Sequence, residues 1–495
     1  MFRLALIRLY WLVAETGLPW DFARPAWPAS SDLEAPGSST SDPLYPEFLR
    51  NMFSFRRLVW VAPLLAPWVL YAGCKNSTST KIPSGPKGSA STRGASGAAI
   101  DDPAAVEALT KLGAKLSQNS AGAVVEVDLS DTNIPVRNDN LAAVKGLPEL
   151  ERIKLFGADY NDGALDYILG ATKLRLLGLE RTGVTNDGLG KLVGLSNLES
   201  IDLSQASFIS DDGLTHLAKL PKLRTLQLVK CNIGDEGVAH LAAVSTLVGL
   251  DLRDTLVSDA CFESLQGMTK LKSLRCQGSG SRLHDDGLQF LAGIQSLVAL
   301  GLENSQITDS GLAQLAGLTN LEELYLTRAN ISDAGLEHLK GLRKLRVLRL
   351  RDTGISDAGI THLAALPQLK IVDLSESAVG DDGVAVLARL PALEDLNLWN
   401  TVVGDEGVKH LLGNKTLKRL NLDNLGISDD AVDAIVSLEN AEWIHLGKSN
   451  ITNAGLEKFA RMPNLKTLIV TFCTSVTSEG VENLKAAKSG LQVEH

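Results

Sequence analysis

A sequence pattern that recurs about every 24 residues covers most of this 495-residue chain and limits the folds that it can adopt. The clearest copy spans residues 321–345 and reads LEELYLTRANISDAGLEHLKGLRKL. Eleven of the thirteen steps between successive copies are 24 residues long, and the other two are 25 and 26. Such a repeat indicates stacked, similar units rather than separate globular domains. The copies align at positions 150, 174, 198, 223, 247, 271, 297, 321, 345, 369, 393, 417, 441 and 465.

Each copy predicts one short strand followed by one helix. Leu324 and Leu326 share one face of a strand, whereas Leu336, Leu339 and Leu342 have the three-residue spacing of one helix face. One copy cannot bury these leucines alone, so the copies must stack. Neighbouring strands lie about 4.8 Å apart but packed helices need about 8 to 10 Å, which forces the helices to the outer side. The expected fold is therefore a right-handed α/β solenoid, a horseshoe with a concave parallel sheet and convex helices.

The order of residues in the repeat resembles the cysteine-containing subclass of leucine-rich repeats. It consists of leucines two residues apart, a small residue, and then Ile, Ser or Thr, Asp, any residue, Gly and Leu. That subclass is known from the substrate-receptor arms of F-box proteins, and similar arrays occur in bacterial proteins. The resemblance implies a horseshoe over residues 124–495 that recognises proteins and catalyses no reaction. The small position holds Thr182, Cys231, Thr255, Ser305, Thr353, Thr401 and Cys473.

Residues 52–74 have the layout of a secretory signal peptide. Two arginines precede an uncharged run from residue 58 to 73, and Ala-Gly-Cys follows the last large side chain of that run. This ending resembles the lipobox of bacterial lipoproteins, although Tyr71 stands where that family usually has leucine. The resemblance implies that Cys74 is acylated. An uncleaved signal anchor is the alternative, although the 16 residues of the run fall short of the roughly 20 that span a membrane.

The segments on either side of this signal are expected to lack a packed core. Residues 1–51 are either a disordered extension or not part of the natural protein, because a signal belongs at the start of a chain and Met52 directly precedes this one. Residues 75–100 are rich in Ser, Thr, Gly, Lys and Pro and predict a flexible tether. These features predict a protein that is secreted across the inner membrane, lipid-anchored in the cell envelope and facing the periplasm or the cell surface.

A capping helix is expected ahead of the repeats, within residues 101–123. Asp102 followed by Pro103 is typical of a helix start. Such a helix would cover the first repeat, whose core is otherwise open to solvent. Its apolar face would consist of Val106, Leu109, Leu112 and Leu116.

Charge and residue spacing argue against nucleic-acid binding, metal binding and catalysis. A net charge of -10 without an extended basic patch disfavours nucleic acid. His445 is the only histidine expected on the concave sheet, and its neighbours Asn421, Asn397 and Asp373 supply no nucleophile. Aspartates that recur in register are expected to cap the helices, which leaves their oxygens committed to backbone amides rather than to calcium. We therefore expect no enzyme activity and no cofactor. The aspartates are Asp211, Asp235, Asp259, Asp285, Asp309, Asp333, Asp357, Asp381, Asp405 and Asp429.

The expected partner-binding patch centres on Trp399 and Trp443, at strand positions predicted to face solvent on the concave side. Tryptophan, tyrosine and arginine dominate interface hot spots. Alternatively, the two rings only shield neighbouring strands. The other residues assigned to the patch are Tyr325, Arg349, Arg351, Asp395, Arg419, Asp423 and His445.

The sequence as a whole predicts a monomeric, non-catalytic scaffold of the cell envelope that binds a protein partner on its concave face. Its membrane contact would be the lipid anchor or the signal anchor alone. The first alternative is a module that binds glycans or other envelope polymers, which would favour aromatic side chains along the whole array rather than at one end. The second is the substrate-receptor arm of a ubiquitin-ligase-like complex, although the signal and tether before the array leave no room for an F-box.

Overall fold

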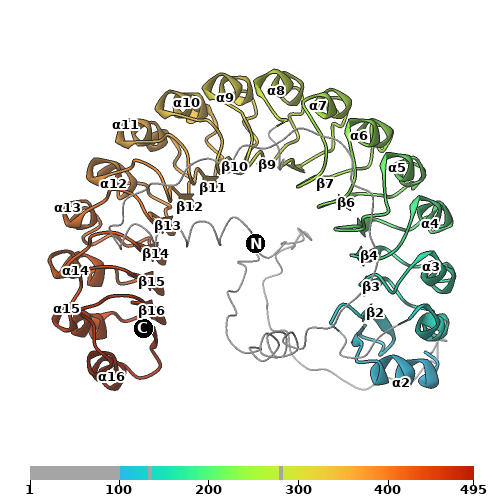
Figure 1. The fold of residues 1–495 in the computed structure, drawn as a ribbon, viewed down its shortest axis with the longest axis horizontal. Helices are drawn as coiled ribbons and strands as arrows, with labels where there is room; N and C mark the ends of the chain where they lie inside the picture. The colour runs from blue at the N-terminus through green and yellow to red at the C-terminus, as the bar shows by residue number, and fades with distance from the viewer. Residues whose placement is uncertain (1–100, 132–136, 278–281) are drawn as a thin grey trace, which may run out of the picture. The chain divides into compact units, whose positions relative to one another are not determined.

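In the computed structural model, the described residues are 101–131, 137–277 and 282–495. They form a curved array in which strands line the concave side and helices line the convex side (Figure 1). The predicted α/β solenoid, with its concave sheet and convex helices, is therefore confirmed. The predicted signal peptide, Cys74, the tether and residues 1–51 lie outside the described residues.

The described strands form a single sheet. β1 pairs with β2 in antiparallel orientation, and from β2 to β17 every strand runs parallel to the next one along the chain. The register repeats, so that Leu324 lies beside Leu300 and Leu348. The strands are β1 (Lys115–Gln118), β2 (Val124–Asp128), β3 (Arg152–Phe156), β4 (Leu176–Glu180), β5 (Ser200–Asp202), β6 (Thr225–Gln227), β7 (Gly249–Asp251), β8 (Ser273–Arg275), β9 (Ala299–Gly301), β10 (Glu323–Tyr325), β11 (Val347–Arg349), β12 (Ile371–Asp373), β13 (Asp395–Asn397), β14 (Arg419–Asn421), β15 (Trp443–His445), β16 (Thr467–Ile469) and β17 (Gln492–Glu494).

Short helices follow the strands on the convex side. In the described ranges, none of them is long or apolar enough to cross a membrane. The α-helices are α2 (Pro103–Lys111), α3 (Asp162–Ile168), α4 (Asn186–Lys191), α5 (Asp211–Leu217), α6 (Asp235–Leu241), α7 (Ala260–Leu265), α8 (Asp285–Leu291), α9 (Asp309–Leu315), α10 (Asp333–Glu337), α11 (Asp357–Ile360), α12 (Asp381–Leu387), α13 (Asp405–Lys409), α14 (Asp429–Val436), α15 (Asn453–Glu457) and α16 (Ser478–Ala487). The 3-10 helices are η1 (Asn138–Gly146), η2 (Leu192–Gly194), η3 (His338–Gly341), η4 (Thr361–Ala365) and η5 (Lys458–Arg461).

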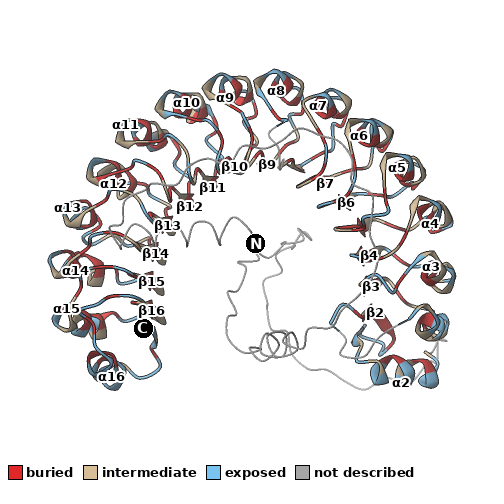
Figure 2. Cartoon of the chain, in the orientation of Figure 1, coloured by how far each residue is buried: buried red, intermediate tan, exposed pale blue. Residues whose placement is uncertain are grey.

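The leucines of the repeat form a continuous core between the sheet and the helices. Leu324, Leu326 and Leu336 are all 0% exposed, and Figure 2 shows the buried residues following the array from one end to the other. Burying one leucine side chain contributes about 1.5–3 kcal/mol. Because each repeat completes this core only with its neighbours, stability arises from stacking.

The ten aspartates in register connect neighbouring repeats instead of capping their own helices. Asp309 is the first residue of α9, whose N-cap is Thr308. Its carboxylate accepts hydrogen bonds from the backbone N–H and the hydroxyl of Ser332, the N-cap residue of the next helix. Each of the other nine likewise accepts a hydrogen bond from a backbone N–H of the next repeat. The expectation that they cap their own helices is wrong, because the amides within reach belong to the next repeat.

A glycine in the first turn of the helix leaves space for the carboxylate of the preceding repeat. A Cβ atom at Gly335 would lie 2.3 Å from Asp309 Oδ1. Real Cβ contacts are essentially never shorter than 3.0 Å, so a side chain here would displace the aspartate. The recurring Asp-x-Gly motif is therefore a packing requirement between repeats. The same close approach recurs at Gly237, Gly311, Gly359, Gly383 and Gly407.

Helix α2 is shorter than the capping helix expected within residues 101–123. Asp102 is its N-cap and accepts a 2.9 Å hydrogen bond from the N–H of Ala104. The helix ends just before Gly113, whose φ of 82° allows the chain to leave the helix. The chain then forms β1, where Leu116 lies beside Val127. Leu116 is on a strand rather than a helix because β1 provides hydrogen-bonding partners for the otherwise open edge of β2.

Candidate binding surface

The concave face is lined by the side chains on either side of the buried central residue of each strand. On β15, Trp443 and His445 flank the buried Ile444 and are themselves half-buried. The nine residues predicted to form the patch lie within β10 to β15 or two residues after one of these strands. Seven of them form three contacting groups, and His445 and Asp423 lie beside one another at the end of the patch.

The first group joins Asp395, Arg419 and Trp443 on three adjacent strands in one register. The guanidinium carbon of Arg419 lies 4.4 Å from the centroid of the Trp443 ring. Arg419 Nε is also 3.2 Å from Asp395 Oδ2. Burial raises the pKa of Asp395, and the charge of Arg419 opposes this effect. The three side chains therefore hold one another in place before any partner arrives.

The second group joins Arg351 and Trp399 across an intervening strand. The guanidinium carbon of Arg351 lies 4.9 Å from the centroid of the Trp399 ring, and its Nε donates a 2.7 Å hydrogen bond to Glu376. Ser375 occupies the corresponding position of the repeat between them and is 0% exposed. Its small side chain leaves room for this contact. Glu376, which sequence reasoning does not select, thus helps to position Arg351.

The third group surrounds Tyr325, which is only 7% exposed. The guanidinium carbons of Arg275 and Arg349 lie 4.4 and 5.6 Å from the centroid of its ring. The hydroxyl donates a 2.7 Å hydrogen bond to Glu323, and burial, aided by this contact, raises the pKa of Tyr325 to about 12. Arg275 can reach the ring because the strand between them carries Gly301 at this register.

His445 and Asp423 lie near one another at the end of the patch. Nε2 of His445 is 3.8 Å from Asp423 Oδ1, and the ring of Trp443 meets the imidazole edge-on at a centroid distance of 5.8 Å. Burial lowers the pKa of His445, and the charges of Asp423 and Glu494 offset only part of this effect. The imidazole is therefore neutral at pH 7.

We expect His445 to titrate below 6.5 in the folded chain, as followed by NMR of its imidazole carbon. The unfolded chain then binds this proton more tightly than the folded chain, so stability is lost as the pH falls below about 6.5. The melting temperature of His445→Gln should fall less than that of the wild type between about pH 7.5 and 5.5. A histidine pKa at or above the ordinary value would contradict this account of its burial.

His445, Asp423 and Thr471 do not form a nucleophilic triad. Such a triad needs the carboxylate on one ring nitrogen and the hydroxyl on the other. Here the carboxylate of Asp423 faces Nε2, and both this nitrogen and the hydroxyl of Thr471 point to the space above Gly447. In the described ranges, no three His, Cys, Asp or Glu side chains are grouped so that they could hold a metal ion.

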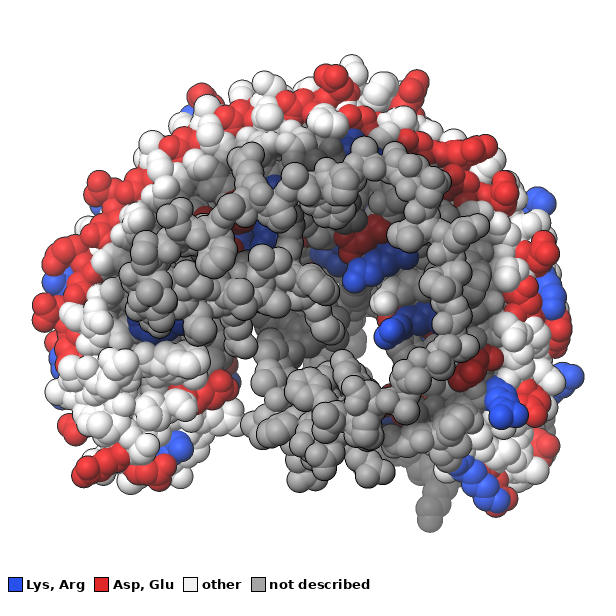
Figure 3. All heavy atoms as spheres, in the orientation of Figure 1, with Lys and Arg blue, Asp and Glu red and all other residues white. Residues whose placement is uncertain are grey.

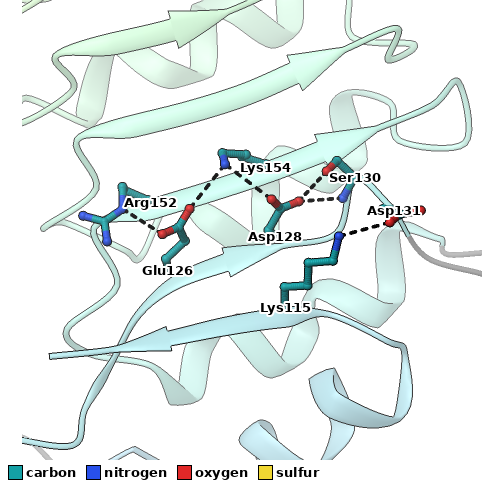
Figure 4. A network of polar contacts seen from close by, with 7 residues as sticks. All are labelled: Lys115, Glu126, Asp128, Ser130, Asp131, Arg152 and Lys154. Carbon is teal, nitrogen blue, oxygen red and sulfur yellow. Dashed lines mark hydrogen bonds and ion pairs between the residues drawn. The ribbon is translucent and has the colours of Figure 1, made fainter. Parts of the chain in front are cut away.

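At the other end of the sheet, the concave side chains pair with one another (Figure 4). Arg152 Nε lies 3.1 Å from Glu126, and Lys154 Nζ lies 3.3 Å from both Glu126 and Asp128. Burial raises the pKa of Asp128, but the hydrogen bonds from Ser130 and the charge of Lys154 outweigh it, and the pKa is lowered overall. The charges of these four side chains therefore already neutralise one another at this end of the sheet.

The convex side carries a different set of side chains. Acidic residues are spread along the visible outer rim of the array (Figure 3). Several stand directly after the first aspartate of a helix, where a negative charge is favourable beside the helix N-terminus. The concave sheet, in contrast, mixes aromatic residues with charges of both signs. The residues following that first aspartate include Asp212, Glu236, Asp286, Asp382, Glu406 and Asp430.

A comparison with protein-family models agrees with the repeat architecture. A family model described as leucine rich repeat matches residues 219–242, 317–340, 341–364 and 461–485. No curated protein matches the chain in sequence. Among solved structures, the chain is similar to an internalin from Listeria monocytogenes, with 20% identity, 70% of this chain and 94% of that chain covered, and a TM-score of 0.44. It is also similar to a Rad7 and Elc1 complex in yeast, with 21% identity, coverages of 72% and 88%, and a TM-score of 0.47.

A leucine-rich-repeat protein of Leptospira interrogans is similar as well, with 16% identity, coverages of 75% and 89%, and a TM-score of 0.42. The four matched repeats share the strand register of the other repeats in the array. Four repeats of the array thus match the leucine-rich-repeat model, and the described part of residues 124–495 is a solenoid of strand–helix repeats.

Proposed function

We propose that this chain is a non-catalytic scaffold that binds a protein partner on its concave face, over β10 to β16. Leucine-rich-repeat arrays generally serve protein–protein interaction and present extended concave surfaces. The observation that carries the proposal is the gathering of Trp399, Trp443 and three patch arginines on neighbouring strands. These residue types supply most hot spots of protein interfaces. Because the arginines already hold the rings, less side-chain freedom is lost on binding.

A protein partner is favoured over a glycan by the contacts of the two tryptophan rings. A guanidinium group already lies over each ring, at 4.9 Å for Trp399 and 4.4 Å for Trp443. Sugar binding would need bare ring faces, whereas here a guanidinium group lies over a face of each ring and carries charged donors. Mixed surfaces of this kind suit the backbone and charged side chains of a protein.

The proposal includes a place for the protein in the bacterial cell envelope, with the repeats of the cysteine-containing type. Its support is the signal-like layout of residues 52–74 and the Ala-Gly-Cys sequence that ends at Cys74. An acylated Cys74 and the tether after it would hold a monomeric solenoid at a membrane surface. Mass spectrometry of the mature amino terminus tests this part, since an unmodified or uncleaved terminus would contradict it.

Site-specific photo-crosslinking in the full chain tests the binding face. A photoreactive phenylalanine analogue at Asn421, on β14 between the two tryptophan groups, should capture a protein partner in extracts of the source cells. The same analogue at Glu337, exposed on the convex helix α10, serves as the control. Equal capture at both positions, or capture only at Glu337, would contradict a concave binding site.

A further inference from the structure

Three polar side-chain atoms converge above Gly447, at the end of the tryptophan patch. A Cβ atom at this glycine would lie 2.6 Å from Asp423 Oδ1, 2.9 Å from His445 Nε2 and 3.0 Å from Thr471 Oγ1. Gly447 is the floor of this space, which we call the Gly447 cradle. Asp423 and Thr471 belong to the flanking repeats, and His445, the last residue of β15, precedes Gly447 by two residues. The cradle therefore exists only because Gly447 has no side chain.

The glycine is unusual for its place in the repeat. Two residues after the end of a strand, the other repeats from β5 onward carry a residue with a side chain. Gly447 is the one glycine of this row and lies between Asp423 and Thr471. From β5 onward, the residues of this row are Ser204, Val229, Arg253, Gln277, Glu303, Thr327, Arg351, Ser375, Trp399, Asp423, Gly447 and Thr471.

The groups around the cradle lack partners within the described part of the chain. His445 Nε2 is buried and has no hydrogen-bond partner there. Its distance of 3.8 Å from Asp423 Oδ1 is too long for a hydrogen bond. No lysine or arginine among the described residues forms an ion pair with Asp423, whose side chain is 20% exposed. A buried polar atom without a partner is costly, so a donor that approaches these atoms from the concave side, beyond the position of a Cβ atom, would be stabilising.

The chemistry of the cradle matches a primary ammonium group. Asp423 supplies a negative charge, the neutral imidazole can offer the lone pair of Nε2, and the hydroxyl of Thr471 is a further acceptor. An ammonium group carries three N–H donors on one compact atom, whereas the donors of a guanidinium group are spread over a planar fork. Building on the proposed function, we propose that the Gly447 cradle receives a lysine side chain or the amino terminus of the bound protein.

NMR titration of the full chain with small amines tests this site. Nα-acetyl-lysine methylamide presents only a side-chain ammonium, and glycine amide presents only an α-ammonium group. We expect at least one of them to shift the His445 imidazole resonances with a millimolar dissociation constant. A response to the first identifies a lysine side chain, and a response to the second identifies an amino terminus. The diacetylated lysine methylamide, which has no ammonium group, should have no effect.

Variants connect this response to the cradle. Gly447→Ala fills the space with a methyl group, and Asp423→Asn keeps its shape but removes the charge. Either should weaken amine binding at least about tenfold, as expected for a charge-assisted hydrogen bond. Gly426→Ala is the matched control, since a Cβ there meets nothing within 4 Å. Equal binding of the diacetylated compound, unchanged binding by Asp423→Asn, or a response to zinc or calcium ions alone would overturn the ammonium site.

The two proposals can fail separately. If a partner is captured at Asn421 but neither amine affects His445, the ammonium site is wrong and the concave binding face stands. If an amine binds in the cradle but no protein is captured at Asn421, the binding face is wrong instead.

Discussion

Gly335→Ala is expected to lower the free energy of unfolding by about 2 kcal/mol, measured by urea denaturation followed by circular dichroism. The new methyl group would lie 2.3 Å from Asp309 Oδ1 and would push the carboxylate away from the N–H and the hydroxyl of Ser332. Hydrogen bonds to a charged group contribute about 1.5–3 kcal/mol each, and part of this loss is recovered by rearrangement. The interface between two repeats is weakened, although no leucine has changed.

Gly317→Ala is the matched control for this substitution. Gly317 lies after helix α9, and a Cβ there meets nothing within 4 Å. A compatible glycine-to-alanine change stabilises a protein by about 0.4–1 kcal/mol through the unfolded state. A stability of Gly335→Ala equal to that of Gly317→Ala would contradict the role of the aspartate ladder.

The aspartate ladder shows which part of the fold the sequence alone does not reveal. Asp309 directly follows Thr308 at a helix start, which is the pattern of a helix cap. Its actual partner, Ser332, is 23 residues away and comes within reach only when the repeats stack. The leucine spacing predicts that stacking, but it does not specify the distance between neighbouring helix starts. The hydroxyl that recurs at Ser332 and its equivalents is the signal that could have identified the contact.

The sequence predicts the candidate site about as far as it predicts the fold. Alternation along each strand is enough to place Trp443, Arg349 and Arg419 on the concave sheet, whereas Trp399, predicted at a strand position, lies two residues after the end of β13. It does not predict how long side chains lean across neighbouring strands. Gly301 lets Arg275 cover Tyr325, and the same kind of gap above Gly447 draws three polar atoms together. Small residues in the concave rows therefore mark the places where side-chain contacts depart from the regular pattern.

The charged side chains of the concave sheet have different contacts at its two ends, which the amino-acid composition does not show. Near β2 and β3, Arg152 and Lys154 face Glu126 and Asp128 and are neutralised by them. Toward β11 to β15, Arg351 and Arg419 are likewise ion-paired, with Glu376 and Asp395, but each also lies over a tryptophan ring. The N–H donors that each guanidinium group does not use in its ion pair remain available to the carboxylates and carbonyls of a partner. The two tryptophan rings are therefore the reason for placing the proposed binding face at this end of the array.

Replacing both tryptophans, Trp399→Ala with Trp443→Ala, is expected to weaken binding of the partner captured at Asn421 at least about 100-fold, because each hot-spot residue contributes about 2 kcal/mol or more. The loss would include the arginines, since Arg351 and Arg419 rest on the two rings and would no longer be held in position. Isothermal titration calorimetry with the purified partner measures the change.

Phe208→Ala provides the control, because Phe208 is an aromatic residue that is 63% exposed and lies outside the strands of the sheet. Its removal should leave partner affinity unchanged. If the double tryptophan variant binds as tightly as the wild type and melts at a lower temperature, the rings only shield the sheet, and the binding face must lie elsewhere. If affinity falls while the melting temperature stays the same, the rings act in recognition, because shielding the strands would have contributed to stability without any partner.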